Sequence, residues 1–490
     1  MNQAEAREWL RSGDYSLVYA AEVTPKNADD TLDIFTHEFF LQGGKLRLAT
    51  EYVNAGDYVY YGTMSKILGA SSKLPSNLIG NPPQGTGSVT MQIVGDELPA
   101  WLADMRLVDF EGADIVIRAG KRGQKFEDML LVHTGTVSNP RLTDNSHRIE
   151  FRLGGRINAL TSDVYSVPTV DIGCTFAHQK IYGKCARVNT RPFDGGGDIE
   201  FYYADQLITL DKVYLNGYES TAYTQPSACR VKMNGSAAWT ETKKIEVDCT
   251  FASSQAAEVI GNAIYDSTAL PYENFTVDSL DYLEGITYQC GAVLARNDTG
   301  KIYTKTWADF LDLMVGGTGG TWQFDRHGSI RLLHLYKELY SYSPDVLSTL
   351  RLNDYVSVDS SAIPKFGKVT VKIEKTNAPD EMWAVLGGAS GGTEGAQREL
   401  TAGETKYNQA DLTLVSPITN EAHGQQLTDL IKAGRYQRVY GFKGCLTGMT
   451  YDVGDELVID HDVDGYLKRG RKVVVLEANI TKDQLFKVAA

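Results

Sequence analysis

Short segments in which apolar residues occupy every second position recur along this chain, separated by turns rich in Gly, Pro and Asn. Segments 88–94 (SVTMQIV) and 368–373 (KVTVKI) show the pattern most clearly. A period of two is typical of half-buried β-strands. We expect further strands at 16–23, 45–52, 113–118, 129–137, 147–153, 199–203, 207–215, 329–335, 456–459 and 472–479. Strands this short and frequent favour barrels or sandwiches. The sequence therefore predicts a mostly β, multi-domain protein.

Helical spacing interrupts the strands in the third quarter of the chain. Apolar residues at 256, 259, 260, 263 and 264 lie on one face of a helix over 254–265. Segment 306–314 (TWADFLDLM) has the same spacing and runs into the Gly-rich stretch Gly316–Gly320. Other expected helices cover 4–10, 99–107 and 421–433. The fold class expected is mostly β with an α+β insertion.

A chain of 490 residues is too long for one small core, so several domains are expected. Turn-rich stretches and the change from strand to helix spacing suggest the boundaries. We expect an N-terminal β-rich domain, a second β domain, an α+β domain, and a β domain with closing barrel strands, at 1–155, 156–250, 251–355 and 356–490.

The charge balance argues against nucleic-acid binding as the main role. The chain has 62 acidic and 48 basic residues, a formal charge of −14. Duplex DNA repels such a chain unless it has a separate basic face. The opening residues, MNQAEAREWL, lack the basic and apolar regions of a secretory signal, and no apolar stretch approaches the length of a membrane span. We expect no stable nucleic-acid binding and no membrane span.

Motifs of catalysis are missing from the sequence, so we predict no catalytic residues. The eight histidines form neither HxxxH nor HExxH, and Gly316–Gly320 lacks the Lys-Ser/Thr of a phosphate-binding loop. The tract His461-Asp462-Val463-Asp464 lacks the spacing of an EF-hand, and we interpret it as a solvated turn. Asp278 and Asp281 cannot be distinguished from ordinary surface charges.

Cysteine offers the one metal alternative. Cys174, Cys185, Cys229 and Cys249 lie in the second expected domain and could in principle converge on an iron–sulphur cluster. Their spacing matches none of the familiar cluster motifs, and it lacks the close pairs of structural zinc sites. We interpret them as reduced, buried cysteines and expect no cofactor, with the cluster as the alternative.

Strand tyrosines leave a second functional class open. Tyr58, Tyr60, Tyr61, Tyr202 and Tyr203 could stack on sugar rings. Adjacent residues of a strand point to opposite faces, so about half of them belong to a core or an interface. The alternative function is therefore a carbohydrate-binding or glycan-degrading β protein acting at the host envelope.

Two segments resemble the baseplate hub or tail-tip proteins of long-tailed phages and gene transfer agents. Trp322–Leu332 (WQFDRHGSIRL) is similar to a hub hairpin in which an acidic-basic-Gly turn joins an aromatic strand to an Arg-containing strand. Val453–Ile459 with 465–475 resembles the closing barrel of those hubs. Ile181–Lys184 with 208–217 looks like their second domain, and 46–50, 60–62 and 87–93 are compatible with their first. The order of these segments carries the resemblance.

The resemblance implies a structural virion protein without enzymatic activity, located at the tail tip and assembled in the host cytoplasm. Such a hub is a homotrimer that caps the tail tube and opens for genome ejection. Its expected partners are the distal tail protein, the tape-measure protein, and tail fibres or other tip proteins. The first two domains and the closing strands 456–479 would form the ring, and the α+β region would lie distally.

Overall fold

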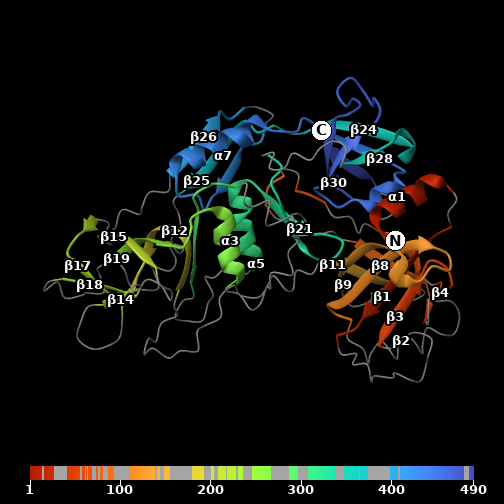
Figure 1. The fold of residues 1–490 in the computed structure, drawn as a ribbon, viewed down its shortest axis with the longest axis horizontal. Coiled ribbons are helices and arrows are strands. Elements are labelled where there is room, and N and C mark those ends of the chain that lie inside the picture. Colours follow the sequence, from red (N-terminus) through yellow and green to blue (C-terminus); the bar gives the residue numbers. More distant parts are fainter. Residues whose placement is uncertain are drawn as a thin grey trace.

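The computed structural model describes the whole chain except for a set of internal segments. Those segments are 14–15, 27–40, 43, 56–57, 61, 63, 69–72, 76–77, 81–86, 93–109, 138–140, 144–147, 155–178, 193–199, 203–207, 217, 228–229, 235–244, 266–285, 296–306, 337–346, 364, 374–397, 407–408 and 479–484. The fold is mostly β and consists of several sheets with a few helices (Figure 1), so the predicted fold class is confirmed. The expected helix at 99–107 falls outside the described residues.

The first part of the chain forms a nine-stranded antiparallel sheet, named here the N-terminal sheet. Its order is β2 (Leu41–Gln42), β3 (Lys45–Ala49), β1 (Leu17–Thr24), β8 (Ala113–Lys121), β9 (Leu130–Val137), β11 (Arg148–Gly154), β7 (Gly87–Gln92) and β6 (Met64–Leu68), and β10 (Arg141–Thr143) pairs with β11. A small hairpin, β4 (Val53–Ala55) with β5 (Tyr58–Tyr60), accompanies it. In β8, Ala113, Ile115, Ile117 and Ala119 are buried at alternate positions, as the sequence period predicts.

The second region contains two smaller antiparallel sheets. One has the order β16 (Tyr218–Ser220), β15 (Thr209–Leu215), β19 (Ile245–Phe251), β12 (Gln179–Asn189) and β20 (Gly291–Ala295). The other has the order β13 (Arg191–Pro192), β14 (Glu200–Tyr202), β18 (Arg230–Met233) and β17 (Tyr223–Ser227). Strand β20 comes from the region expected to be α+β, so this sheet draws strands from both sides of residue 250.

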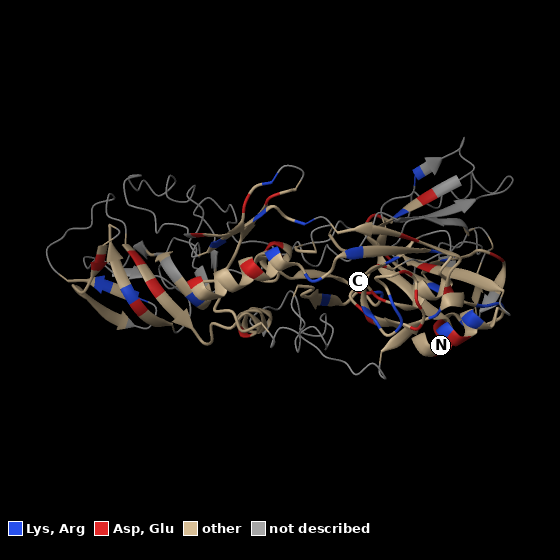
Figure 2. Ribbon diagram, turned by 90° about the horizontal axis from the view of Figure 1, so that it is seen from above, with Lys and Arg blue, Asp and Glu red and all other residues tan. Residues whose placement is uncertain are grey.

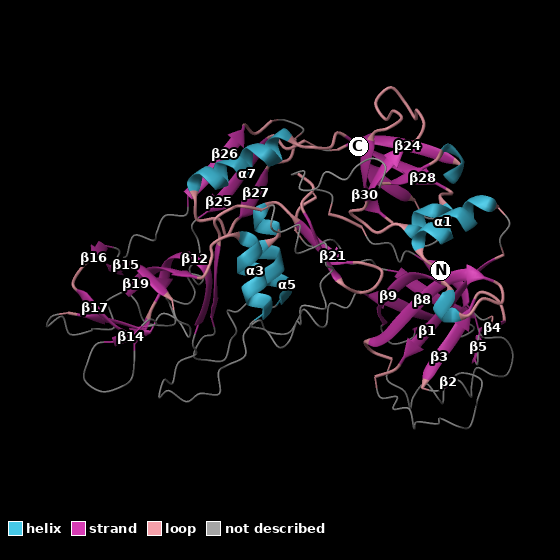
Figure 3. Cartoon of the chain, in the orientation of Figure 1, coloured by secondary structure: helices cyan, strands magenta, loops and turns pink. Residues whose placement is uncertain are grey.

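A helical core lies in the middle of the molecule (Figure 3). It combines α3 (Ala256–Tyr265), α5 (Trp307–Met314), the hairpin β21 (Thr321–Phe324) and β22 (Ile330–Leu333), and α7 (Glu421–Ala433) on the sheet β26 (Arg398–Gly403), β25 (Lys368–Ile373) and β27 (Leu412–Val415). Their buried side chains form one cluster in which Trp307 and Trp322 are the largest. The expected helices at 254–265, 306–314 and 421–433 are confirmed to within two residues.

The last part of the chain forms a six-stranded sheet, named here the closing sheet. Its order is β23 (Ser348–Leu350), β29 (Glu456–Ile459), β30 (Lys472–Glu477), β31 (Phe486–Ala489), β28 (Arg438–Lys443) and β24 (Ser357–Ala362). Only β23 runs parallel to its neighbour. The core of this sheet also contains Leu74 and Leu78 from the first part of the chain. The three boundaries between the four expected domains stay a prediction, and two sheets pair strands that lie on opposite sides of one of them.

The described residues form an elongated molecule. The N-terminal and closing sheets lie at one end, the second region lies at the other, and the helical core lies between them (Figure 1). Lys and Arg are interspersed with Asp and Glu over the described strands (Figure 2). No helix in the described part of the chain is both long and apolar enough to cross a bilayer.

Candidate interdomain junction

The hairpin β21–β22 is closed by a turn that its own sequence stabilises. The Asp325 carboxylate accepts hydrogen bonds from the backbone N–H groups of His327 (2.9 Å) and Ser329 (2.8 Å). Gly328 has a φ of +78°, a left-handed conformation that glycine adopts without strain. The Asp-Arg-His-Gly order therefore fixes the turn, and the turn fixes the direction of the Arg326 side chain.

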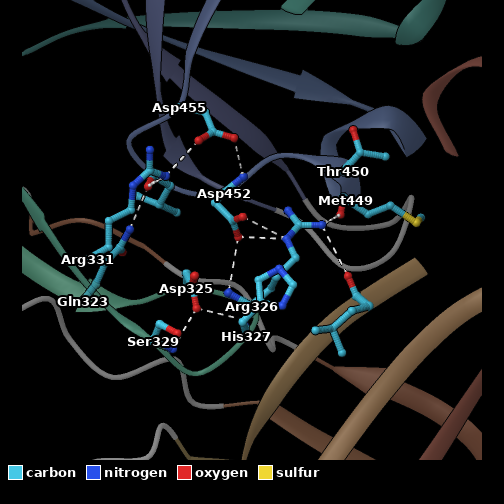
Figure 4. Close-up of polar contacts among 12 residues, drawn as sticks. Gln323, Asp325, Arg326, His327, Ser329, Arg331, Met449, Thr450, Asp452 and Asp455 are labelled. Carbon is cyan, nitrogen blue, oxygen red and sulfur yellow. Dashed lines mark hydrogen bonds and ion pairs between the residues drawn. The ribbon is translucent and has the colours of Figure 1, made fainter. Parts of the chain in front are cut away.

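Arg326 extends from this turn into the space between the N-terminal and closing sheets (Figure 4). Its Nε lies 2.9 Å from both carboxylate oxygens of Asp452, which precedes β29. Its Nη1 donates to the Met449 carbonyl at 2.9 Å and to the Leu131 carbonyl of β9 at 3.3 Å. One guanidinium thus joins the hairpin, the closing sheet and the N-terminal sheet.

A second arginine of the hairpin binds the turn that opens β29. Arg331 Nη1 donates to the Val453 carbonyl (2.9 Å) and to Asp455 (2.8 Å). Gln323 Nε2 donates to the same Val453 carbonyl at 2.9 Å. Gly454 has a φ of +90°, and a Cβ there would lie 2.6 Å from the Leu333 side chain. The Gly is therefore required both by the backbone conformation and by the packing of the hairpin.

The junction is largely shielded from water. Arg326 is 6% exposed, and the side chain of Asp452 is 17% exposed. Buried ion pairs of this kind contribute little beyond an apolar replacement, but removing one partner leaves an uncompensated charge. Burial and the nearby charge of Asp452 raise the pKa of Asp325 above its ordinary 3.8, while the N–H bonds from Ser329 and His327 oppose the shift.

The N-terminal helix α1 (Gln3–Ser12) makes a further connection to the closing sheet. Arg11 binds both carboxylate oxygens of Asp354, at 2.8 Å through Nε and 3.0 Å through Nη2. Its Nη2 also donates to the Thr349 carbonyl of β23 at 2.7 Å. Arg7 lies over the ring of Tyr451, 5.0 Å from its centroid. The helix begins at a capping box formed by Asn2 and Glu5.

A strap of residues from the first part of the chain adds backbone contacts. The Leu74 N–H donates to the Leu476 carbonyl at 3.0 Å, beside a bridge between Lys73 and Glu477. The Gly80 N–H donates to the Gly320 carbonyl at 2.9 Å, close to the start of β21. The hairpin, the helix and the strap together fix the two sheets relative to each other.

A second buried polar cluster lies inside the N-terminal sheet. Glu22 of β1 accepts hydrogen bonds from Lys45 (2.8 Å), Arg47 (3.0 Å) and Tyr60 (2.7 Å). Burial by itself would raise the pKa of Glu22, but the hydrogen bonds of Lys45 and Tyr60 and the neighbouring positive charges lower it below 4.5. Three donors thus converge on the Glu22 carboxylate and compensate its buried charge.

The cysteines considered for a cluster are only partly placed. Cys185 of β12 and Cys249 of β19 are cross-strand partners, buried and unbridged, and burial raises the pKa of both thiols. Cys174 and Cys229 lie outside the described residues. Within the described part of the chain, no three His, Cys, Asp or Glu side chains are placed to hold a metal ion.

The tract around His461 forms the turn between β29 and β30. The carboxylate of Asp464 accepts the backbone N–H groups of Leu467 (2.6 Å) and Tyr466 (2.7 Å), and these bonds lower its pKa. His461 Nε2 lies 2.6 Å from the Tyr355 hydroxyl. The tract is thus a turn, as the sequence predicts, but its His461 side chain is only 14% exposed and is not solvated.

The two strand tyrosines whose side chains are described, Tyr58 and Tyr60, do not form one platform. Tyr60 is fully buried, whereas Tyr58 is 41% exposed with Arg47 stacked on its ring at 3.7 Å. Tyr61 and Tyr203 lie outside the described residues. Asp278 and Asp281 also lie outside them.

The sequence singles out the hairpin Trp322–Leu332 and the segment Val453–Ile459, but it shows neither their contact nor the role of Asp452. It also misses Arg11, Asp354 and the strap. The Asn2–Glu5 capping signal predicts that a helix starts there. The sequence does not show which distant residue an arginine binds in the folded chain.

No protein-family model matches the chain, and no curated protein matches it in sequence. Among solved structures it is similar to phage tail proteins. The 43 kDa tail protein of prophage MuSo2 from Shewanella oneidensis is 11% identical, with 89% of this chain and 96% of that chain covered and a TM-score of 0.37. A tail protein from Neisseria meningitidis MC58 is 10% identical over 96% of both chains, with a TM-score of 0.39. Prophage tail protein gp18 from Listeria monocytogenes EGD-e is 8% identical over 96% and 94%, with a TM-score of 0.35.

Proposed function

We propose that this chain is a structural protein of a phage-type tail, and specifically a hub at the tail tip. In this role it caps the tail tube as a homotrimer, without enzymatic activity, and opens for genome ejection. Its partners are the distal tail protein, the tape-measure protein and other tip proteins.

One observation carries the proposal. The two segments with the strongest resemblance to hub proteins, the hairpin Trp322–Leu332 and the turn that opens β29, lie against each other. Arg326 binds Asp452, and Arg331 binds Asp455. Arg326 and Arg331 of the hairpin and Asp455 of the turn are thus residues of the junction, and Asp452 directly precedes that turn. The contact between the two segments supports the proposal.

The junction also suits a structural role. A buried guanidinium whose Nε binds a carboxylate and whose Nη1 binds two backbone carbonyls fixes direction as well as distance, because its donors have a rigid geometry. A tail protein that transmits a conformational change along the tail needs sheets that move as one unit. The Arg326 contacts join the N-terminal and closing sheets in this way.

Imaging of particles tests the proposal. We expect antibodies against this chain to label one end of a tail, and a reconstruction of that end to place its sheets around the tube axis with three-fold symmetry. Six copies or a single asymmetric copy would contradict the trimer. Absence of the chain from particles would end the proposal.

Enzyme assays distinguish the alternative class. Purified protein should not release sugars or peptides from peptidoglycan or polysaccharide. Turnover of either substrate that persists in an Arg326→Met variant would favour a glycan-degrading protein over a hub.

A further inference from the structure

The two edges of the closing sheet differ sharply. Strand β23 is three residues long, and Arg11 Nη2 binds the Thr349 carbonyl at that edge. Strand β24 is six residues long, and among the described residues it pairs only with β28 (Figure 1). Unpaired edge strands tend to pair with other chains. One edge is short and covered, while the other is long and open.

The hydrogen-bond pattern shows which groups of β24 point outward. Its register with β28 is unbroken from Ser357 opposite Lys443 to Ala362 opposite Arg438. The next residue, Ile363, donates its N–H to the Gln437 carbonyl at 3.0 Å. In an antiparallel ladder such pairs alternate, so the odd-numbered residues bond to β28. The N–H and C=O groups of Val358, Ser360 and Ala362 therefore point away from the sheet.

The side chains of β24 do not block an approaching strand. Its sequence is SVDSSA, in which every residue except Val358 is exposed. It contains no Pro, Lys or bulge, which are the usual protections of an edge. Asp359 is its single charged residue and is paired with Lys443 at 2.7 Å.

We propose that a second copy of this chain pairs with β24 through its own β24, as an antiparallel two-fold dimer centred on Ser360. Ser360 then lies opposite the partner's Ser360, and Val358 lies opposite the partner's Ala362. All three are the residues whose backbone groups point outward, so each pair exchanges two backbone hydrogen bonds. The two closing sheets become one continuous sheet.

The side chains select this register. With Ser360 at the centre, Asp359 lies opposite the partner's Ser361, whose hydroxyl can donate to the carboxylate. A shift of the centre to Asp359 would place two carboxylates directly opposite each other, which is destabilising. The contact is isologous, because each subunit presents the same strand.

The dimer is a state of the free chain and does not depend on the proposed tail role. Two substitutions in the same strand test it with opposite signs. Ser360→Lys places two ammonium groups opposite each other at the dyad, and Ser361→Lys places a lysine opposite each Asp359. Cross-strand pairs of this kind change a dissociation constant by up to about fivefold each. We expect Ser360→Lys to weaken the dimer and Ser361→Lys to tighten it.

Sedimentation equilibrium of the purified full chain, over a wide concentration series, measures these constants. Both positions are exposed, so thermal melts should match wild type at concentrations where all three proteins are monomeric. Hydrogen exchange should slow at the amides of Val358, Ser360 and Ala362 as concentration rises. A wild-type monomer at every concentration would overturn the proposal. So would equal effects of the two lysines, or a self-association that leaves these three amides unprotected.

Discussion

Removal of the Arg326 guanidinium should weaken the contact between the N-terminal and closing sheets while each sheet still folds. In Arg326→Met the apolar stem remains, but Asp452 loses the Nε donor that both of its carboxylate oxygens share, and the Met449 and Leu131 carbonyls lose a donor. Breaking a buried ion pair costs about 3–5 kcal/mol. Because the Asp452 side chain keeps 17% of its exposure, we expect the lower end, about 3 kcal/mol.

The assay is chemical denaturation of the full chain, followed by tryptophan emission, within a double-mutant cycle with Asp452→Asn. The cycle isolates the coupling between the two side chains. Arg331→Met gives a graded comparison, because Arg331 and Asp455 are more exposed, at 18% and 26%, and a loss of about 1 kcal/mol is expected. Lys372→Met removes a surface pair with Glu399 and should cost the least of the three.

The ranking Arg326, Arg331, Lys372 is the result that matters. An Arg326→Met variant no less stable than Lys372→Met would refute the reasoning, because the contact would then carry no buried charge. An Arg326→Lys variant keeps the charge but not the fork of donors, so it should recover only part of the loss.

Burial lowers the pKa of His133 from 6.5 to about 4. As pH falls below 6.5, the unfolded chain gains a proton that the folded chain does not, and the folded state loses stability. The melting temperature of His133→Gln should therefore fall less than that of wild type between neutral pH and about pH 5. The pKa of Asp325 is raised in the folded state, so its protonation contributes stability that is complete below pH 3.8 and is lost as pH rises through the folded pKa. Asp325→Asn keeps the acceptor oxygen, so its melting temperature should depend less on pH over that window. An unchanged slope of melting temperature against pH would count against a buried carboxylate. Gly454→Ala should lower the melting temperature, because both its φ of +90° and the Leu333 contact exclude a Cβ, whereas Gly470→Ala, with a φ of +82° but open space, should lower it less. Metal analysis of the purified protein should find no stoichiometric iron. Stoichiometric iron that is lost in Cys185→Ser would instead support the iron–sulphur cluster.

Local pattern predicted the elements well where one face is buried. The alternation in 368–373 and the apolar run in 472–479 predict strands that appear as β25 and β30, and the apolar stripe of 421–433 predicts α7. Each of these patterns reflects the neighbours of a residue along the chain and the side of the element that faces a core.

Pairing between distant segments could not be predicted in the same way. Strand β23 runs parallel to β29, and the Leu74 and Leu78 side chains lie in the core of the closing sheet. A leucine in a loop carries no signal of which core receives it. The junction shows the same limit, since the turn Asp325–Ser329 is evident from its sequence while the choice of Asp452 as partner depends on the whole topology.

The packing of α1 against the short 3₁₀ helix Leu446–Thr450 has a consequence for folding during synthesis on the ribosome. Ala6, Trp9 and Leu10 are buried beside Met449, which belongs to the short 3₁₀ helix Leu446–Thr450 near the other end of the chain. Helix α1 leaves the ribosome long before the 3₁₀ helix Leu446–Thr450 does. Contacts between segments so far apart form slowly, and exposed apolar surface attracts aggregation in the meantime. The contact between α1 and Met449 therefore forms only after the intervening sheets have been synthesised, and until then α1 can bury its apolar face only against the N-terminal sheet.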